Sequence, residues 1–120
     1  MKITFHTLLA LMGGVVLSVG LLAQEQTKDD VGKKIFTENK CQSCHSIEAV
    51  GIKKKPNQKP PDLSAVGAER KAEFLAAYLK KKETLNNAKH MVSFKGSDED
   101  LGVLSTWLES LKGDSAKPSK

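Results

Sequence analysis

Two thiols and an imidazole lie close together in the segment Cys41-Gln42-Ser43-Cys44-His45. Cysteines three positions apart are close to one helical turn from each other, so both sulfurs can reach the two vinyl groups on one edge of a porphyrin. The histidine directly after the second thiol is then held beneath the iron as its proximal ligand. This C-x-x-C-H spacing is the attachment signature of c-type haem. The sequence therefore predicts one covalently bound haem c, attached through Cys41 and Cys44, with His45 as an iron ligand.

Three other interpretations of the two cysteines stay open. A disulfide between Cys41 and Cys44 alone would suit an exported protein. A thioredoxin-like dithiol would need a βαβ unit around it, which the sequence pattern does not show. A zinc site would have to recruit both thiols together with His45 and His90, because a structural zinc ion takes four ligands. We favour haem attachment, because the motif agrees with the signs of export in the N-terminal segment.

The N-terminal segment has the pattern of a secretory signal peptide. Lys2 provides the positive start, residues 8–23 form an apolar run, and the chain turns polar at Gln24. The run of 16 residues is shorter than the roughly 20 that span a bilayer. We therefore predict a signal peptide over residues 1–23, cleaved after Ala23, and an exported, periplasmic protein. The alternative is an uncleaved N-terminal anchor, which alone would attach the chain to a membrane.

Length and composition leave room for one small domain and exclude several classes of protein. The 120 residues are too few for a large α/β enzyme with a two-domain cleft, and two cysteines are too few for a disulfide-dense scaffold. With 39% hydrophobic residues the chain is not disordered, but with only 5% aromatics its own core is thin. Such a domain usually needs a stabilising element besides its own side chains, which is consistent with a non-protein group in its interior. The net charge is +5, but the basic residues lack the interleaved aromatics expected for nucleic-acid binding.

Hydrophobic periodicity predicts three helices that position these groups, over residues 29–40, 69–82 and 98–112. Thr27 and Ser97 are good N-caps for the first and third helices, and each is followed by an aspartate three residues later. The apolar stripes of the three helices are Val31, Ile35 and Phe36; Phe74, Leu75, Tyr78 and Leu79; and Leu101, Leu104, Leu108 and Leu111 with Trp107.

The remaining segments are irregular. No alternating strand pattern of useful length is present, so the predicted fold class is all-α, with three or more helices wrapped around one covalently bound haem. The prolines near residues 50–61 exclude a continuous helix there and predict a long loop. The domain is expected to cover residues 24–113. Gly113 ends the last helix, and residues 114–120 form a flexible tail.

Residues on two of the predicted helices match a known family. Gly32 and Phe36 fit its Gly-x-x-x-aromatic pattern on the helix before the haem motif. Leu104 and Trp107 fit its Leu-x-x-aromatic pattern on the last helix. Together with the C-x-x-C-H motif, they make the chain resemble a class I, monohaem cytochrome c over roughly residues 29–111. The resemblance implies a small cytochrome c-like fold in which these two helices cross, with the glycine allowing close approach beside the aromatics.

The segment Pro61-Asp62-Leu63 resembles the Pro-x-Leu that follows the loop in this family. The resemblance implies that the Pro61 carbonyl accepts the Nδ1 proton of His45. Such a bond fixes the ring of a metal-binding histidine and raises its basicity. Pro60 stands where the family usually has glycine, and a stiff linker is the plain alternative for the two prolines.

The resemblance also implies a second axial ligand, for which Met91 is the candidate. Met91-Val92-Ser93-Phe94 resembles the family's axial methionine followed closely by an aromatic, and it is the only methionine beyond the predicted signal peptide. A methionine that merely fills the core is the plain alternative. His90 is the rival ligand, because imidazole also binds haem iron, and a bis-histidine site would have a lower potential.

With both axial positions filled, the chain resembles an outer-sphere, one-electron carrier between redox proteins, and not an enzyme. Lysines cluster within residues 53–59 and 80–95, and they form either a docking rim for an acidic partner or only a solvated surface. Those at positions 80–82 are expected in the last turn of the second helix, where cations suit the helix dipole. The alternatives are a haem subunit of a periplasmic dehydrogenase or oxidase, and a haem-based sensor or peroxidase-like enzyme in which Met91 leaves the iron open.

Overall fold

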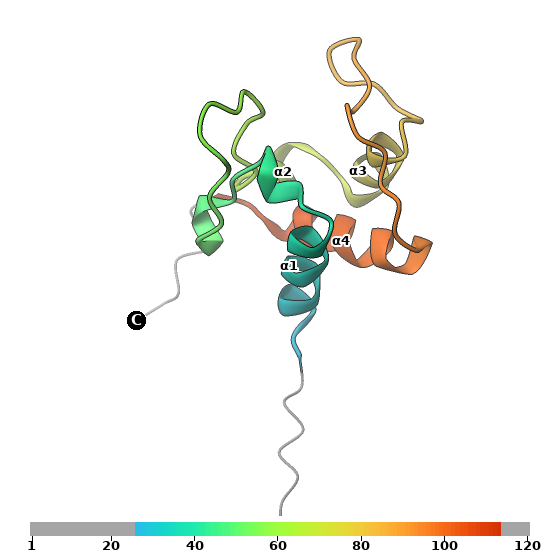
Figure 1. Ribbon diagram of the computed structural model, residues 1–120. Coiled ribbons are helices and arrows are strands. Elements are labelled where there is room, and N and C mark those ends of the chain that lie inside the picture. The colour runs from blue at the N-terminus through green and yellow to red at the C-terminus, as the bar shows by residue number, and fades with distance from the viewer. Residues whose placement is uncertain (1–25, 114–120) are drawn as a thin grey trace, which may run out of the picture.

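The computed structural model describes residues 26–113, and the regular structure of this part is helical (Figure 1). It contains no strand, only two isolated bridges, and none of its helices is long and apolar enough to cross a membrane. The prediction of an all-α fold is therefore confirmed. The predicted signal peptide and C-terminal tail lie outside the described residues. The α-helices are α1 (Lys28–Glu38), α2 (Val66–Glu69), α3 (Ala72–Leu79) and α4 (Asp98–Ser110), and the short 3-10 helices are η1 (Cys41–Ser43) and η2 (Glu48–Val50).

The two predicted helix starts with N-caps are confirmed. The hydroxyl of Thr27 accepts a hydrogen bond from the amide of Asp30 at the start of α1. The hydroxyl of Ser97 accepts one from the amide of Asp100 at the start of α4. Each cap satisfies a backbone N–H that would otherwise lack a partner, and the nearby carboxylates suit the positive end of the helix dipole.

The first and third helices end two residues earlier than predicted. α1 ends at Glu38 and not at residue 40, because Lys40 is left-handed with a φ of 57°. α4 ends at Ser110 and not at residue 112, because the backbone of Leu111 is extended. This change of direction lets the Leu111 side chain join the buried core.

The prediction of one helix over residues 69–82 is wrong. Arg70 has an extended backbone (φ −128°, ψ 139°), which separates α2 from α3. Beyond Leu79 the chain leaves helical geometry, with Lys81 at a φ of 59°. The lysines at positions 80–82 consequently lie after the helix and not in its last turn.

A side chain from α4 sets the start of α3. The carboxylate of Glu109 accepts a hydrogen bond from the amide of Ala72 (2.9 Å) and pairs with the ammonium group of Lys71 (3.2 Å). Lys71 is the N-cap residue, and its own side chain makes no capping bond. The Ala72 amide, followed by Lys71, holds the pKa of the Glu109 carboxyl below its usual value. The cap of α3 thus comes from a residue almost forty positions away in the sequence.

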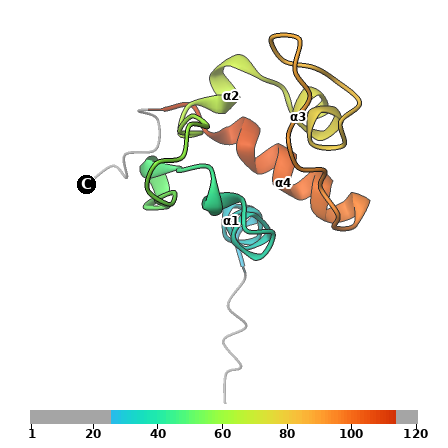
Figure 2. The same cartoon turned by 45° about the horizontal axis from the view of Figure 1, so that its top comes forward.

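Helices α1 and α4 cross as the family resemblance implied, and Figure 2 shows this crossing with α1 viewed nearly along its axis. Gly32 is buried against Trp107, and a Cβ at position 32 would overlap the indole side chain. The ring of Phe36 meets the Trp107 ring edge to face, with centroids 5.9 Å apart. A residue without a side chain is therefore what allows the two helices to approach so closely.

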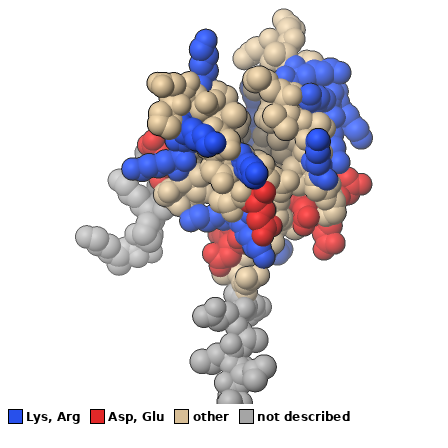
Figure 3. Space-filling view, in the orientation of Figure 1, with Lys and Arg blue, Asp and Glu red and all other residues tan. Residues whose placement is uncertain are grey.

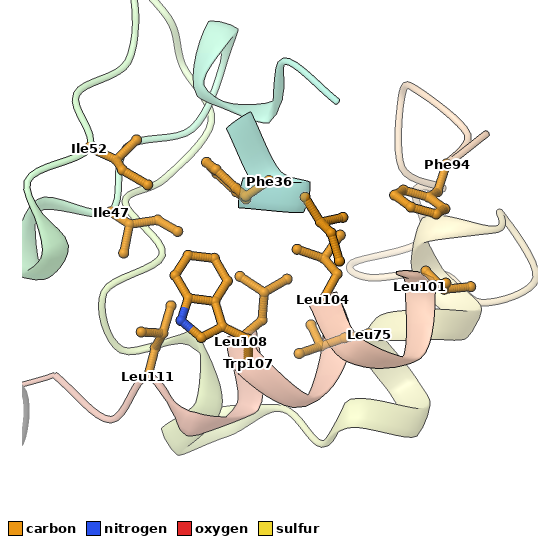
Figure 4. Packing of buried hydrophobic residues seen from close by; sticks show 11 residues of the cluster. Phe36, Ile47, Ile52, Leu75, Phe94, Leu101, Leu104, Trp107, Leu108 and Leu111 are labelled. Carbon is orange, nitrogen blue, oxygen red and sulfur yellow. The ribbon is translucent and has the colours of Figure 1, made fainter. Parts of the chain in front are cut away.

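One buried cluster runs along α4 and joins the other elements to it (Figure 4). From α3 only Leu75 is buried, whereas Phe74, Tyr78 and Leu79 are half-buried. The apolar side chains of α3 are thus only partly buried in the protein core. The buried hydrophobic residues are Ile35, Phe36, Ile47, Ile52, Leu75, Phe94, Leu101, Leu104, Trp107, Leu108 and Leu111.

Candidate haem site

The C-x-x-C-H motif forms a single tight turn directly after α1. The carbonyl of Cys41 accepts hydrogen bonds from the amides of both Cys44 (3.1 Å) and His45 (2.9 Å). The side chain of Gln42 donates to the carbonyl of Thr37 in the last turn of α1 (3.2 Å). The motif is therefore fixed to the end of a helix that is itself packed against α4.

Both cysteines are free thiols and half-buried. Burial raises the pKa of the Cys41 thiol, as does the nearby Cys44, against the lowering effect of a backbone hydrogen bond. The thiols are thus unbonded and one turn apart, as attachment to two vinyl groups requires. The disulfide interpretation has no support in this geometry.

The imidazole of His45 is oriented by a backbone carbonyl. Its Nδ1 lies 3.0 Å from the carbonyl oxygen of Pro61, which is the contact that the family resemblance implied. Burial lowers the pKa of His45, the bond to Pro61 opposes this, and the nearby His90 and Lys54 lower the pKa further. A neutral ring that donates through Nδ1 leaves the Nε2 lone pair for a metal.

The loop that carries Pro61 is tied down on both sides. The ammonium group of Lys54 donates to the carbonyl of Pro60 (2.7 Å), and the amide of Leu63 donates to the carbonyl of Ser46 (2.9 Å). Because Ser46 directly follows the haem motif, the second bond joins the loop to the motif itself. Pro60, the departure from the family pattern, does not disturb the contact to His45.

Asp62 is a structural residue of this loop that the sequence analysis did not single out. Its carboxylate accepts the amides of Glu48 (3.0 Å) and Ser64 (2.9 Å). Desolvation raises the pKa of Asp62, but hydrogen bonds from Ser64, Glu48 and Ser46 outweigh it and lower the pKa to about 2. The only sequence signal was its place inside the Pro-x-Leu match.

A second segment, residues 80–95, follows α3 and brings His90 close to the C-x-x-C-H turn. Its chain reverses at Asn86 and Asn87, which are both left-handed (φ 51° and 62°), between the mutually hydrogen-bonded Leu85 and Ala88. Consecutive left-handed residues of this kind are typical of a type I′ turn, in which asparagine is favoured. The turn brings the chain back towards α3.

The structure brings His90, and not the side chain of Met91, to His45. The ring centroids of His45 and His90 are 6.1 Å apart, with the planes inclined by 14°. The ring of Tyr78 on α3 meets His90 edge to face at 5.4 Å. Met91 is 87% exposed. Its role as an iron ligand stays a prediction.

The space-filling view shows a hollow between two lobes on the face where the loops stand (Figure 3). By comparison with Figure 1, one lobe contains η2 and the loop after it, and the other contains α3 and the segment 80–95. Within residues 26–113, no three His, Cys, Asp or Glu side chains gather as a metal cluster. The zinc interpretation, which needs four ligands together, therefore has no support in this part of the chain.

The family model described as Cytochrome c matches residues 30–112. The chain belongs to the cytochrome c family. The match covers α1 from its third residue, the C-x-x-C-H turn, both loops and α4. Searches of curated proteins and of solved structures returned no significant match.

Membership of the cytochrome c family means covalently attached haem c, and the residues present fit that group. The structure supplies two free thiols in one turn and an imidazole fixed through Nδ1. Cytochrome c domains transfer electrons, so this chain is a haem-based electron carrier. Cys41, Cys44 and His45 are the residues that would hold the haem in this cytochrome c.

Proposed function

We propose that this protein is a periplasmic, monohaem cytochrome c that carries single electrons between redox proteins and catalyses no bond chemistry itself. The observation that carries the proposal is the C-x-x-C-H turn, in which two free thiols stand one turn apart beside an imidazole oriented by the Pro61 carbonyl. When bound, the haem supplies a one-electron Fe(III)/Fe(II) couple. The single C-x-x-C-H motif supports one haem.

The protein's own residues hold the geometry constant during electron transfer. Pro61 fixes the orientation of His45, and Lys54 and Asp62 fix the loop that contains Pro61. A site whose ligands keep their positions in both oxidation states has little structure to reorganise when an electron arrives. This rigidity suits a carrier better than a sensor, which must change coordination to respond.

The proposed location rests on the N-terminal sequence. Its positive start, short apolar run and polar continuation are those of a signal peptide. If the segment is retained as an anchor, the domain is exported all the same and stays at the membrane.

The proposed partner has an acidic docking surface. Lys and Arg side chains gather on both lobes beside the hollow, whereas acidic side chains lie mostly lower on the same face (Figure 3). A basic rim around a redox centre raises the rate of encounter with an acidic partner. The exposed lysines of the two loops are Lys53, Lys55, Lys59, Lys82, Lys89 and Lys95.

The first test is the intact mass of the full chain expressed with cytochrome c maturation machinery. We expect a chain cleaved after Ala23 that carries the mass of one haem. The same preparation should show a reversible one-electron redox titration and no binding of carbon monoxide to the reduced form. Binding of the gas would favour the sensor, and co-purification with a larger redox chain would favour the subunit of a dehydrogenase or oxidase.

The second test concerns docking. Electron exchange with an acidic redox protein should slow as ionic strength rises, because salt screens the attraction. Lys82→Gln with Lys89→Gln should slow it at low salt and flatten the salt dependence. Lys28→Gln, at the first residue of α1 and outside both loops, is the control and should have little effect. Equal effects per charge removed at the loops and at Lys28 would show only a response to net charge.

A further inference from the structure

We propose that Lys54 raises the reduction potential of the haem, through a positive charge that the fold fixes beside His45. The inference rests on the proposed function and deepens it, because it concerns the same haem. It gives Lys54 a role different from that of the neighbouring lysines, which belong to the docking surface.

Lys54 differs from the other lysines of its loop in burial and in bonding. Lys53, Lys55 and Lys59 are exposed, whereas Lys54 is half-buried. The ammonium group of Lys54 donates to the carbonyl of Pro60 at 2.7 Å. This is the short distance of a charge-assisted hydrogen bond, so the charge of Lys54 has a fixed position.

The backbone brings Lys54 opposite His45. Ile47 and Ile52 form an antiparallel bridge and exchange both backbone hydrogen bonds, at 2.9 and 3.0 Å. Both side chains are buried in the core, which holds the bridge in place. In an antiparallel pair, the residues two positions outward on each chain again lie opposite each other and on the same face. Counted from this bridge, those residues are His45 and Lys54.

The hydrogen bond to Pro60 brings the ammonium group to the carbonyl next to the one that orients His45. The carbonyl of Pro61 contacts Nδ1 of His45 at 3.0 Å, so adjacent carbonyls hold the imidazole and the ammonium group. Burial is the main cause that lowers the pKa of His45, and the charge of Lys54 contributes to the lowering. A charge that disfavours a proton on this ring also disfavours added positive charge on an iron bound to it.

The sign of the effect on the potential follows from this repulsion. Oxidation from Fe(II) to Fe(III) adds one positive charge to the site, so a fixed cation favours the reduced state and raises the potential. Water and salt screen a half-buried charge less than an exposed one. If Lys54 only tied the loop, its loss would weaken the contact between Pro61 and His45. The ring would then be less basic, and the potential would rise instead of fall.

The test compares Lys54→Met with Lys55→Met in the full-length, haem-loaded protein, because both changes remove one charge from the same loop. We expect a downward shift of the midpoint potential in Lys54→Met that persists at high ionic strength, and no shift in Lys55→Met under the same conditions. Equal shifts in the two variants, or no shift in Lys54→Met, would overturn the inference. An upward shift in Lys54→Met would also overturn it, because Lys54 would then act only as a tie of the loop.

A conservative variant and a second measurement separate charge from displacement. Lys54→Arg keeps the charge and a donor, and it should keep the potential; a fall as large as that in Lys54→Met would contradict the role of the charge. Solvent exchange of the His45 Nδ1 proton, followed by NMR on the reduced protein, should stay slow in Lys54→Met. The reason is that the bond from the Leu63 amide to the Ser46 carbonyl still holds the loop. Fast exchange would attribute the shift to a displaced imidazole and overturn the inference.

The outcomes for Lys54 and for the proposed function are distinguishable. An unchanged protein that holds no covalent haem would contradict the proposed function itself. A haem-loaded protein whose potential does not respond to Lys54→Met would contradict only the role of Lys54.

Discussion

The ring of Phe36 meets the ring of Trp107 edge to face, with centroids 5.9 Å apart and planes at 66°. This pair joins α1 to α4 at the point where Gly32 lies against the indole. Edge-to-face pairs add to the burial of aromatic surface and depend on the distance between the rings. The spacing of the two helices, and with it the position of the haem motif after α1, is thus set by one small and two large residues.

A methyl group at position 32 should separate these helices. Gly32→Ala places a Cβ within the Trp107 side chain, and we expect a loss of about 1–3 kcal/mol in the free energy of unfolding, as for other overpacked cores. Gly102→Ala is the matched control, because a Cβ there meets nothing within 4 Å. It should stabilise α4 by about 0.5–1 kcal/mol through helix propensity. Denaturant unfolding of the two haem-loaded variants measures both values, and equal changes would refute the close crossing.

Removal of both thiols should abolish covalent attachment. Cys41→Ala combined with Cys44→Ala leaves His45 in place but offers no sulfur to the haem. The denatured protein should then lose haem stain on a gel and show the mass of the polypeptide alone. Ser43→Ala, inside the same turn, should keep the attached haem. Stain recovered from the double variant would mean that the haem is attached elsewhere.

The carboxylate of Asp62 should make the loop sensitive to acid. Its pKa is about 2 in the folded protein, below the 3.8 of an unperturbed aspartate. A lowered pKa contributes stability that is complete above the unfolded value and disappears as the pH falls from about 4 towards 2. Asp62→Asn should flatten this part of the pH profile, and because the carboxylate is exposed the effect should be modest.

Thermal unfolding between pH 2 and pH 5 measures the effect of Asp62→Asn. Glu83→Gln is the control, since Glu83 is exposed and makes no hydrogen bond in the part of the chain that the structure describes. Identical profiles for Asp62→Asn and the unchanged protein would show that the bonds to Glu48 and Ser64 add nothing to stability.

The turn before His90 should tolerate glycine but not a branched side chain. Asn87 has a φ of 62°, which glycine adopts freely and valine does not. Asn87→Val should destabilise the segment by about 1–2 kcal/mol. It should also shift the potential, because the turn belongs to the segment that carries both candidate ligands, Met91 and His90. Asn87→Gly should preserve both quantities within about 0.5 kcal/mol. Equal reduction potentials in the two variants would show that the turn does not influence the haem iron.

Local chemistry made several features predictable. The haem motif and the caps at Thr27 and Ser97 follow from residue types at short spacings, and the crossing at Gly32 was implied by the family resemblance. The contact between His45 and Pro61 was also accessible only through the family resemblance, because nothing near Pro61 in the sequence indicates its partner.

Long-range contacts account for what the sequence did not predict. The break at Arg70 follows from α3 starting under Glu109 of α4, and a local propensity does not report such a cap. The extended backbone of Leu111 depends on the core that it enters. Which of the adjacent His90 and Met91 lies beside His45 depends on side-chain directions in an irregular segment, which periodicity does not determine.

The contacts of the Glu109 carboxylate with Ala72 and Lys71 connect the start of α3 to α4. These contacts hold the N-terminal end of α3, whereas Tyr78 near its C-terminal end contacts the imidazole of His90. Loss of the Glu109 contacts should therefore change the reduction potential of the haem site, while the hydrophobic core stays folded.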